Sequence, residues 1–266
     1  MLLRIEDHDR LRSRPDYEAA LLEDLAWLGF VPDGAPARQS ERGDIYVQAL
    51  DALRRQGLVY ACSCSRAEIE EQTSSPGPSG PAQHDELRYP GTCRDRGLAE
   101  APGLGLRVRL DRSDERFTDL RHGPLDQTPA DQCGDLLVRD RDRHWTYQFA
   151  VTVDDYLQGV TLVIRGDDLL SSTGRQLQLA RLLGRTEPPQ FFHHALIMKP
   201  ASAGGSGQVL KLSKSDRDTG VRDLRAQGWS APRVIGRAAW LAGFIDRETP
   251  LSADEAPRLF AYYPRP

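Results

Sequence analysis

The sequence has no long run of apolar residues and no excess of positive charge. Its apolar stretches fall far short of the roughly 20 residues that a helix needs to span a bilayer. Charged residues begin at Arg4, so the first residues do not form a signal peptide. We therefore expect no membrane span and a cytoplasmic location. The net charge of −4 argues against a surface that binds nucleic acid everywhere, so any RNA contact must be local.

Cysteine is also scarce, with four residues in the chain. Cys62 and Cys64 are separated by one residue, and in a chain without an export signal so close a pair favours a metal site or free thiols over disulfides. The two thiolates can approach a metal from one short turn, and Cys93 can supply a third ligand. His84 or water can supply the fourth. Cys133 has no partner in this pattern, and we expect a small buried residue there.

Apolar residues recur at helical spacing in two segments near the start of the chain. The first follows Ser13, which resembles a capping box with Asp16, and stops at Gly29. It predicts an amphipathic helix with the apolar positions Tyr17, Leu21, Leu25 and Leu28. The second runs from Ser40, a candidate helix cap, to Gly57. Its apolar positions are Tyr46, Leu50 and Leu53.

Six segments have the composition of strands. They are residues 2–5, 58–62, 106–110, 117–120, 135–139 and 160–164. Residues 106–110 alternate strictly, which predicts a strand with one wet face in a mostly antiparallel insertion. Residues 160–164 form a β-branched run, which predicts a parallel strand covered on both faces and followed by a helix at 173–183. A last helix is expected after Ser230. The whole pattern predicts an α/β protein.

Charged residues follow two of the predicted strands. Glu6 and Asp7 come directly after the first strand, and Arg165, Asp167 and Asp168 follow residue 164. Ligands of open α/β sheets bind beyond the carboxyl ends of the parallel strands, so these side chains are expected to face one crevice. A carboxylate that holds an ammonium and a guanidinium that grips a carboxylate suit an amino acid with an acidic side chain. The alternative is a structural ion pair between Glu6 and Arg165.

A glycine-rich segment leads to residues 211–215, Lys-Leu-Ser-Lys-Ser. Lys211 and Lys214 could neutralise the β- and γ-phosphates of a nucleotide as pyrophosphate departs, which stabilises charge without proton transfer. The alternative is a solvated basic loop.

These motifs resemble glutamyl-tRNA synthetases, which are class I aminoacyl-tRNA synthetases, and they occur in that family's order over most of the chain. The matching residues are 3–7, 17–29, 39–42, 147–151, 153–155, 164–169 and 211–215. The resemblance implies a Rossmann-like parallel sheet with a zinc-bearing α+β insertion and a short helical C-terminal region. The implied division is 1–60 and 147–200 for the two parts of the catalytic domain, 61–146 for the insertion, and 201–266 for the lysine loop and helical tail.

Two features point to the shorter glutamyl-Q tRNA(Asp) synthetase branch. Residues 89–93, Tyr-Pro-Gly-Thr-Cys, pair with the Cys62 and Cys64 knuckle, and the chain ends soon after the lysine loop. The branch implies Tyr89 as the fourth Zn²⁺ ligand beside Cys93, where the chemistry alone favours His84 or water. Free thiols without a metal stay an alternative.

The same resemblance implies the reaction and the residues that perform it. Glutamate and ATP, with Mg²⁺, form glutamyl-adenylate without tRNA, and the glutamyl group then passes to queuosine in the anticodon of tRNA(Asp). The residues implied for glutamate binding are Glu6, Tyr147 and Arg165. Lys214 is implied to contact ATP, with Lys211 in the same catalytic loop. We expect a monomer, and the competing hypotheses are a truncated glutamyl-tRNA synthetase and a non-catalytic module that binds RNA or a protein partner.

The family's first strand and its His-Ile-Gly-His-type signature, which hold ATP, do not occur in the sequence; Met1 directly precedes the strand that normally comes second. A site without that half of its ATP clamp loses most of its transition-state stabilisation. We therefore expect the 266-residue chain to activate glutamate weakly or not at all and an upstream-extended version to be active. Glutamate-dependent ATP–pyrophosphate exchange on both versions measures this, and equal robust exchange would contradict it.

Overall fold

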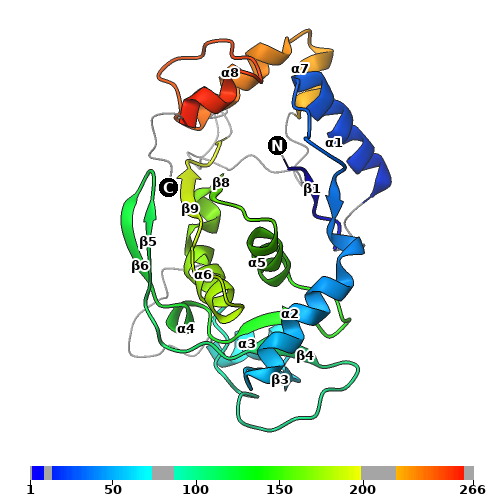
Figure 1. The fold of residues 1–266 in the computed structure, drawn as a ribbon, viewed down its shortest axis with the longest axis vertical. Coiled ribbons are helices and arrows are strands. Elements are labelled where there is room, and N and C mark those ends of the chain that lie inside the picture. Colours follow the sequence, from blue (N-terminus) through cyan, green and yellow to red (C-terminus); the bar gives the residue numbers. More distant parts are fainter. Residues whose placement is uncertain (1, 9–13, 74–86, 199–219, 261–266) are drawn as a thin grey trace.

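The computed structural model describes residues 2–8, 14–73, 87–198 and 220–260 of the chain (Figure 1). The helices are α1 Pro15–Leu28, α2 Gly43–Arg55, α3 Arg66–Thr73, α4 Pro129–Gln132, α5 Tyr147–Leu157, α6 Thr173–Leu182, α7 Val221–Ala226 and α8 Ala231–Leu241. Short 3-10 helices lie at Gln39–Glu41, Asp167–Ser172 and Ala256–Phe260. None of the helices in the described ranges is long and apolar enough to cross a membrane.

The strands form three sheets. They are β1 Arg4–Ile5, β2 Ala37–Arg38, β3 Val59–Cys62, β4 Gly105–Val108, β5 Glu115–Asp119, β6 Gly123–Gln127, β7 Leu136–Arg139, β8 Leu162–Gly166 and β9 Gln190–His194. β1 pairs in parallel with β2, and β3, β4 and β7 form an antiparallel sheet. The third sheet has the order β6-β5-β9-β8, in which β9 is parallel to both β5 and β8. The predicted parallel pairing of the strand at 160–164 and antiparallel pairing of the strands at 106–110 and 135–139 are confirmed.

The β5–β6 hairpin makes one unexpected connection. It comes from the segment predicted as an insertion, yet β5 joins the parallel pair β8–β9 instead of the sheet of β3, β4 and β7. Figure 1 shows the hairpin beside β9 on the opposite side of the molecule from β1. The insertion and the α/β layer therefore share a sheet.

The predicted helices are confirmed, but some of their caps are not the residues that the sequence pattern predicted. Gly29 ends α1 in the left-handed conformation, with a φ of 89°, as the pattern predicts. Ser13 lies outside the described residues, and Arg14 is the N-cap. Ser40 does not cap α2, because its backbone N–H and hydroxyl both donate to the carboxylate of Asp7, at 2.9 and 2.7 Å. Arg42 takes the cap position instead.

The amphipathic pattern predicts burial correctly for α2 and wrongly for α1. Tyr46, Leu50 and Leu53 are at most 1% exposed and form the main core with β4, β7 and α5. By contrast, Tyr17 is 63% and Leu21 51% exposed. α1 lies with α7 and α8 at one end of the molecule, beside only the two-stranded sheet of β1 and β2 (Figure 1), and no residue of the helix is buried.

Two expected exposure patterns are also wrong. β4 has no wet face, because Leu106, Arg107 and Val108 are all buried in the middle strand of its sheet. Arg107 tolerates burial because its guanidinium donates to the backbone oxygen of Asp135 at 2.8 Å and lies on the ring of Tyr89. β8, the edge strand of its sheet, is not covered on both faces, since Ile164 is 41% exposed.

The N-terminal segment is held to α5 by the carboxylate of Asp154, which is fully buried. Arg42 donates to one oxygen at 2.7 Å, and Gln39 and Tyr46 donate to the other, both at 2.9 Å. Arg4 lies 3.9 Å from the same carboxylate and donates to Asp155 at 2.7 Å. β1, the 3-10 helix at Gln39–Glu41 and α2 thus converge on one helix.

We predict that Asp154→Ala lowers the free energy of unfolding by about 3–5 kcal/mol, because it leaves buried cationic and polar groups without their acceptor. Urea unfolding followed by circular dichroism measures the loss. The matched control is Arg66→Ala, which breaks the exposed ion pair with Glu70 and should cost less than about 1 kcal/mol. Equal losses in the two variants would contradict the central role of Asp154.

Candidate functional site

The three residues expected to bind an amino acid come from three different elements and lie around one site. Glu6 follows β1, Tyr147 begins α5 and Arg165 lies in β8. Burial raises the pKa of Tyr147, the Glu6 carboxylate raises it further, and the Arg165 guanidinium opposes that rise. Both charges therefore act on the phenol of Tyr147. Glu6, Tyr147 and Arg165 are thus close enough for their charges to interact, although they are far apart in the sequence.

Glu6 and Arg165 do not form the structural ion pair that was the alternative interpretation. Among the described residues, Glu6 pairs with Arg4 at 3.2 Å. The guanidinium of Arg165 instead donates to neutral groups: to His193 Nε2 at 2.9 Å, Gln176 Oε1 at 2.6 Å and Thr173 Oγ1 at 2.8 Å. The charge of Arg165 is thus held in place without being neutralised by these partners.

Two of the carboxylates expected in the same crevice form hydrogen bonds within the protein. Asp7 accepts from Ser40, as described above, and these hydrogen bonds lower its pKa although burial opposes them. Asp167 accepts from Arg121 at 2.8 Å and lies 2.7 Å from His122 Nε2, both in the turn of the β5–β6 hairpin. Asp7 and Asp167 therefore each have protein partners, and the expectation that they face a ligand stays a prediction.

Sequence reasoning missed the partners of Arg165. His193, at the end of β9, is fully buried, and its Nδ1 lies 2.7 Å from the Asp119 carboxylate of β5. Thr173 and Gln176 come from the first turn of α6. A buried arginine needs acceptors, and a histidine at the end of a buried strand is a candidate. Asp119 gave no such signal, because its pairing with β9 spans more than 70 residues.

The cysteine cluster is confirmed as a cluster. The Sγ atoms of Cys62, Cys64 and Cys93 all lie within 4.8 Å of one another, and those of Cys64 and Cys93 are 3.5 Å apart. The Tyr89 hydroxyl lies 3.4 Å from Cys62 Sγ and accepts from the backbone N–H of Cys93 at 2.8 Å. His84 lies outside the described residues. Cys133 is buried away from the cluster, as predicted.

The donor set fits a tetrahedral metal ion. Ligands at the Zn–S distance of about 2.3 Å are separated by about 3.8 Å in a tetrahedron, close to the distances between these atoms. Burial raises the pKa of Cys93, but hydrogen bonds from Ser63 and Cys64 outweigh it and lower the pKa to about 6. Burial raises the pKa of Cys64 to about 11. A cation placed among these sulfur atoms would favour the thiolate form of each.

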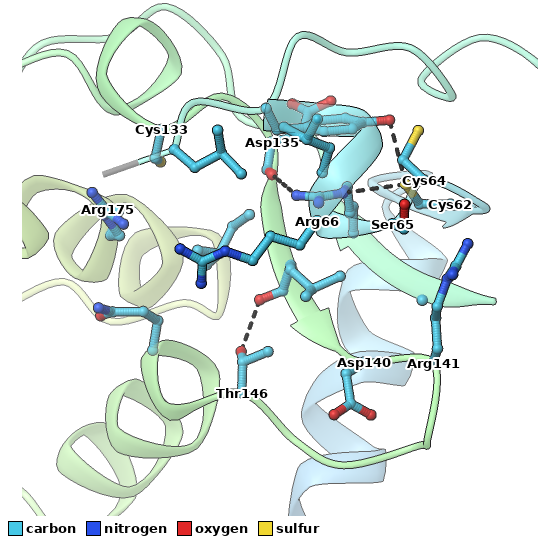
Figure 2. A pocket seen from close by; sticks show the side chains of 18 of the residues that line it. Cys62, Cys64, Ser65, Arg66, Cys133, Asp135, Asp140, Arg141, Thr146 and Arg175 are labelled. Carbon is cyan, nitrogen blue, oxygen red and sulfur yellow. Dashed lines mark hydrogen bonds between the residues drawn. The ribbon is translucent and has the colours of Figure 1, made fainter. Parts of the chain in front are cut away.

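A cavity of about 570 Å³ separates the cysteine cluster from the start of α5 and α6. Figure 2 shows Cys62 and Cys64 at one side of this cavity and Arg175 at the other. The cavity reaches Gln148, whose side chain accepts from Gln176 at 2.7 Å, and Gln176 in turn accepts from Arg165. Its volume is that of small-molecule sites, and Gln148 and Gln176 link its lining to Arg165.

Lys211 and Lys214, predicted to handle the phosphates, lie outside the described residues.

Comparison with known proteins gives concordant matches. The model of the catalytic domain of class I tRNA synthetases (E and Q) matches residues 1–246. The chain is 39% identical to a glutamyl-Q tRNA(Asp) synthetase of Rhodobacter capsulatus, over 88% of this chain and 87% of the relative. It is 40% identical to a glutamyl-Q tRNA(Asp) synthetase of Symbiobacterium thermophilum, over 96% of this chain and 80% of the relative.

A solved structure resembles the fold as well. A glutamate tRNA ligase of Elizabethkingia meningosepticum, crystallised in complex with its amino acid, superposes with a TM-score of 0.72 at 26% identity. The match covers 96% of this chain and 56% of the ligase, so the chain spans just over half the length of that enzyme.

Proposed function

The chain belongs to the class I tRNA synthetases of the E and Q group and, within them, to the glutamyl-Q tRNA(Asp) synthetases, and from this we propose that it joins glutamate to queuosine in tRNA(Asp) with ATP. The proposed substrates are L-glutamate, ATP with Mg²⁺, and tRNA(Asp) bearing queuosine. The proposed enzyme acts in the cytoplasm as a monomer.

The arrangement around Arg165 is the observation that carries the proposal. A guanidinium has five N–H donors, and three are engaged by His193, Gln176 and Thr173, which leaves two for a ligand. Two donors on one planar group suit the side-chain carboxylate of glutamate. Glu6 supplies a carboxylate for the ammonium, and both Glu6 and Arg165 act electrostatically on Tyr147. Glu6, Tyr147 and Arg165 are also the residues that the family resemblance implies for glutamate binding.

The proposed chemistry has two steps. An α-carboxylate oxygen of glutamate attacks the α-phosphorus of ATP, and pyrophosphate leaves to give glutamyl-adenylate. A hydroxyl of the queuosine cyclopentenediol then attacks the acyl carbon, loses its proton, and AMP leaves. Lys211 and Lys214 are the proposed groups that neutralise the departing pyrophosphate, which is electrostatic stabilisation of developing charge.

The two competing hypotheses have less support. A truncated glutamyl-tRNA synthetase would act on a different tRNA, and the identity to the glutamate tRNA ligase is 26%, against 39% and 40% to the glutamyl-Q enzymes. A non-catalytic module does not require a guanidinium that three side chains hold and that keeps two further N–H donors.

We predict that labelled glutamate is transferred to tRNA(Asp) that carries queuosine and not to tRNA(Asp) with unmodified guanosine. The product should form equally on tRNA whose 3′-terminal ribose has been oxidised by periodate after protection of the cyclopentenediol, because the acceptor is in the anticodon. The assay is run on the chain and on its upstream-extended version. Product on the 3′ end of tRNA(Glu) would favour the truncated glutamyl-tRNA synthetase, and no product in either version would favour the non-catalytic module.

Zn²⁺ is the proposed resident metal, with Cys62, Cys64, Cys93 and Tyr89 as its ligands. The support is the convergence of three Sγ atoms and one buried phenol oxygen at distances close to those of a tetrahedral site. Cys62 ends β3, Cys64 lies just before α3, and Tyr89 and Cys93 belong to one later segment. The proposed role of the metal is therefore to hold the start of α3 and the segment around Tyr89 against β3. It is a closed, structural site and takes no part in the two reaction steps.

We predict about one Zn²⁺ per chain in protein purified without chelators, measured by mass spectrometry of the metal. Cys93→Ser should lose most of it and lower the thermal midpoint, because metal affinity contributes to folding. Cys133→Ser is the matched control and should keep the metal, since Cys133 Sγ contacts the backbone oxygens of Pro129 and Gly134. Metal-free wild-type protein with an unchanged midpoint after chelation would mean that the thiols are simply reduced.

A further inference from the structure

The Nε–H of Arg165 is directed at a histidine that is itself held by a buried carboxylate. His193 Nε2 lies 2.9 Å from Arg165 Nε, and His193 Nδ1 lies 2.7 Å from Asp119 Oδ2. Both side chains of this pair are fully buried. Arg165, His193 and Asp119 thus form a line across the three neighbouring strands β8, β9 and β5.

The chemistry of the line fixes the protonation state of the imidazole. An arginine Nε–H can only donate, so His193 Nε2 must be the unprotonated nitrogen that accepts from it. The remaining ring proton is then on Nδ1 and is donated to Asp119, a tautomer that is set by the partner of the other nitrogen. Burial, and to a lesser degree the Arg165 charge, keep the pKa of His193 below its usual value although Asp119 opposes this.

Asp119 is fixed in turn by the backbone. Its Oδ1 accepts from the N–H groups of Arg121 and His122, at 3.0 and 2.9 Å, and its Oδ2 also accepts from the N–H of His193 at 3.1 Å. These hydrogen bonds keep the pKa of Asp119 low against the effect of burial. The carboxylate is therefore ionised and cannot rotate without losing several hydrogen bonds.

We infer that Asp119 and His193 are positioning residues for glutamate binding: they orient the Arg165 guanidinium so that its two remaining donors face the substrate carboxylate. The inference rests on the proposed function, which makes Arg165 the group that grips glutamate. It assigns a substrate-affinity role to the β5–β6 hairpin, which contributes Asp119 although it comes from the segment between the two catalytic parts.

The alternative is that the pair only stabilises the sheet. A structural role predicts that substitutions change stability in proportion to the hydrogen bonds lost, with glutamate affinity unchanged in the folded protein. A positioning role predicts that the affinity for glutamate depends on whether residue 193 presents a hydrogen-bond acceptor to Arg165 at the position of Nε2.

Substitutions at His193 separate the two roles. Glutamine offers both an acceptor for Arg165 and a donor for Asp119, so His193→Gln should keep the glutamate Kd within about 3-fold. Phenylalanine keeps the ring and removes both groups, and His193→Phe should weaken binding by roughly 10- to 100-fold, the effect of a lost hydrogen bond to a charged group. Calorimetric titration of glutamate into the folded variants measures the Kd.

Asp119→Asn tests the tautomer. The amide presents a donor to Nδ1, which favours the Nε2–H tautomer and sets that proton against Arg165 Nε–H. We expect the ¹⁵N chemical shifts of the His193 ring to show Nδ1–H in the wild type and Nε2–H in the variant, with a glutamate Kd raised about 10-fold or more. Arg116→Ala, which breaks an exposed ion pair on the same hairpin, is the control and should alter neither the Kd nor the shifts.

The outcomes also distinguish this inference from the proposed function. Wild-type protein that shows the expected tautomer and its inversion in Asp119→Asn but binds no glutamate overturns the proposed function and leaves the orientation of Arg165 by the pair established. Glutamate binding that is equal in wild type, His193→Phe and Asp119→Asn overturns the positioning role and leaves the proposed function standing. An Nε2–H tautomer in the wild type overturns the inference directly.

Discussion

The carboxylate of Asp154 is the constraint on which the arrangement of the candidate site depends. Arg42, Gln39 and Tyr46 donate to both of its oxygens, and these donors offset the cost of burying the carboxyl group in the core. The segment that carries these donors also carries β1, which ends immediately before Glu6. Tyr147 begins the same helix, α5, that carries Asp154. One buried anion thus sets the position of Glu6 relative to Tyr147.

The sequence predicted local structure well because periodicity reports local structure. The burial of Tyr46, Leu50 and Leu53 followed from helical spacing, and the strands near 58–62, 117–120 and 135–139 from their composition. Exposure in α1, β4 and β8 depends on what lies next to each element, which no local pattern contains. Arg107 is the clearest case, since an alternating arginine predicts a wet face and is buried by the Tyr89 ring and the Asp135 backbone.

The candidate site divides in the same way. The spacing of Cys62 and Cys64 predicted their convergence, whereas Glu6, Tyr147 and Arg165 were named only by a family resemblance, and their role in binding stays a prediction. The partners of Arg165 could not be named from the sequence. Asp119, Thr173 and Gln176 support Arg165 through contacts that exist only once β5 lies beside β9 and α6 packs below them.

The attachments of the β5–β6 hairpin limit which segments of the protein can be removed or exchanged. Gln127 at its end donates to the backbone oxygen of Leu170 and accepts from the N–H of Gly174, at 2.9 and 2.7 Å, so the hairpin is attached to α6 as well as to β9. A segment bound at so many points is not an autonomous module. Excising residues 61–146 or grafting them onto another scaffold would open the edge of β9, expose the Phe191 ring and leave His193 without its anion. Chimaeras between relatives should therefore exchange the hairpin and β9 together.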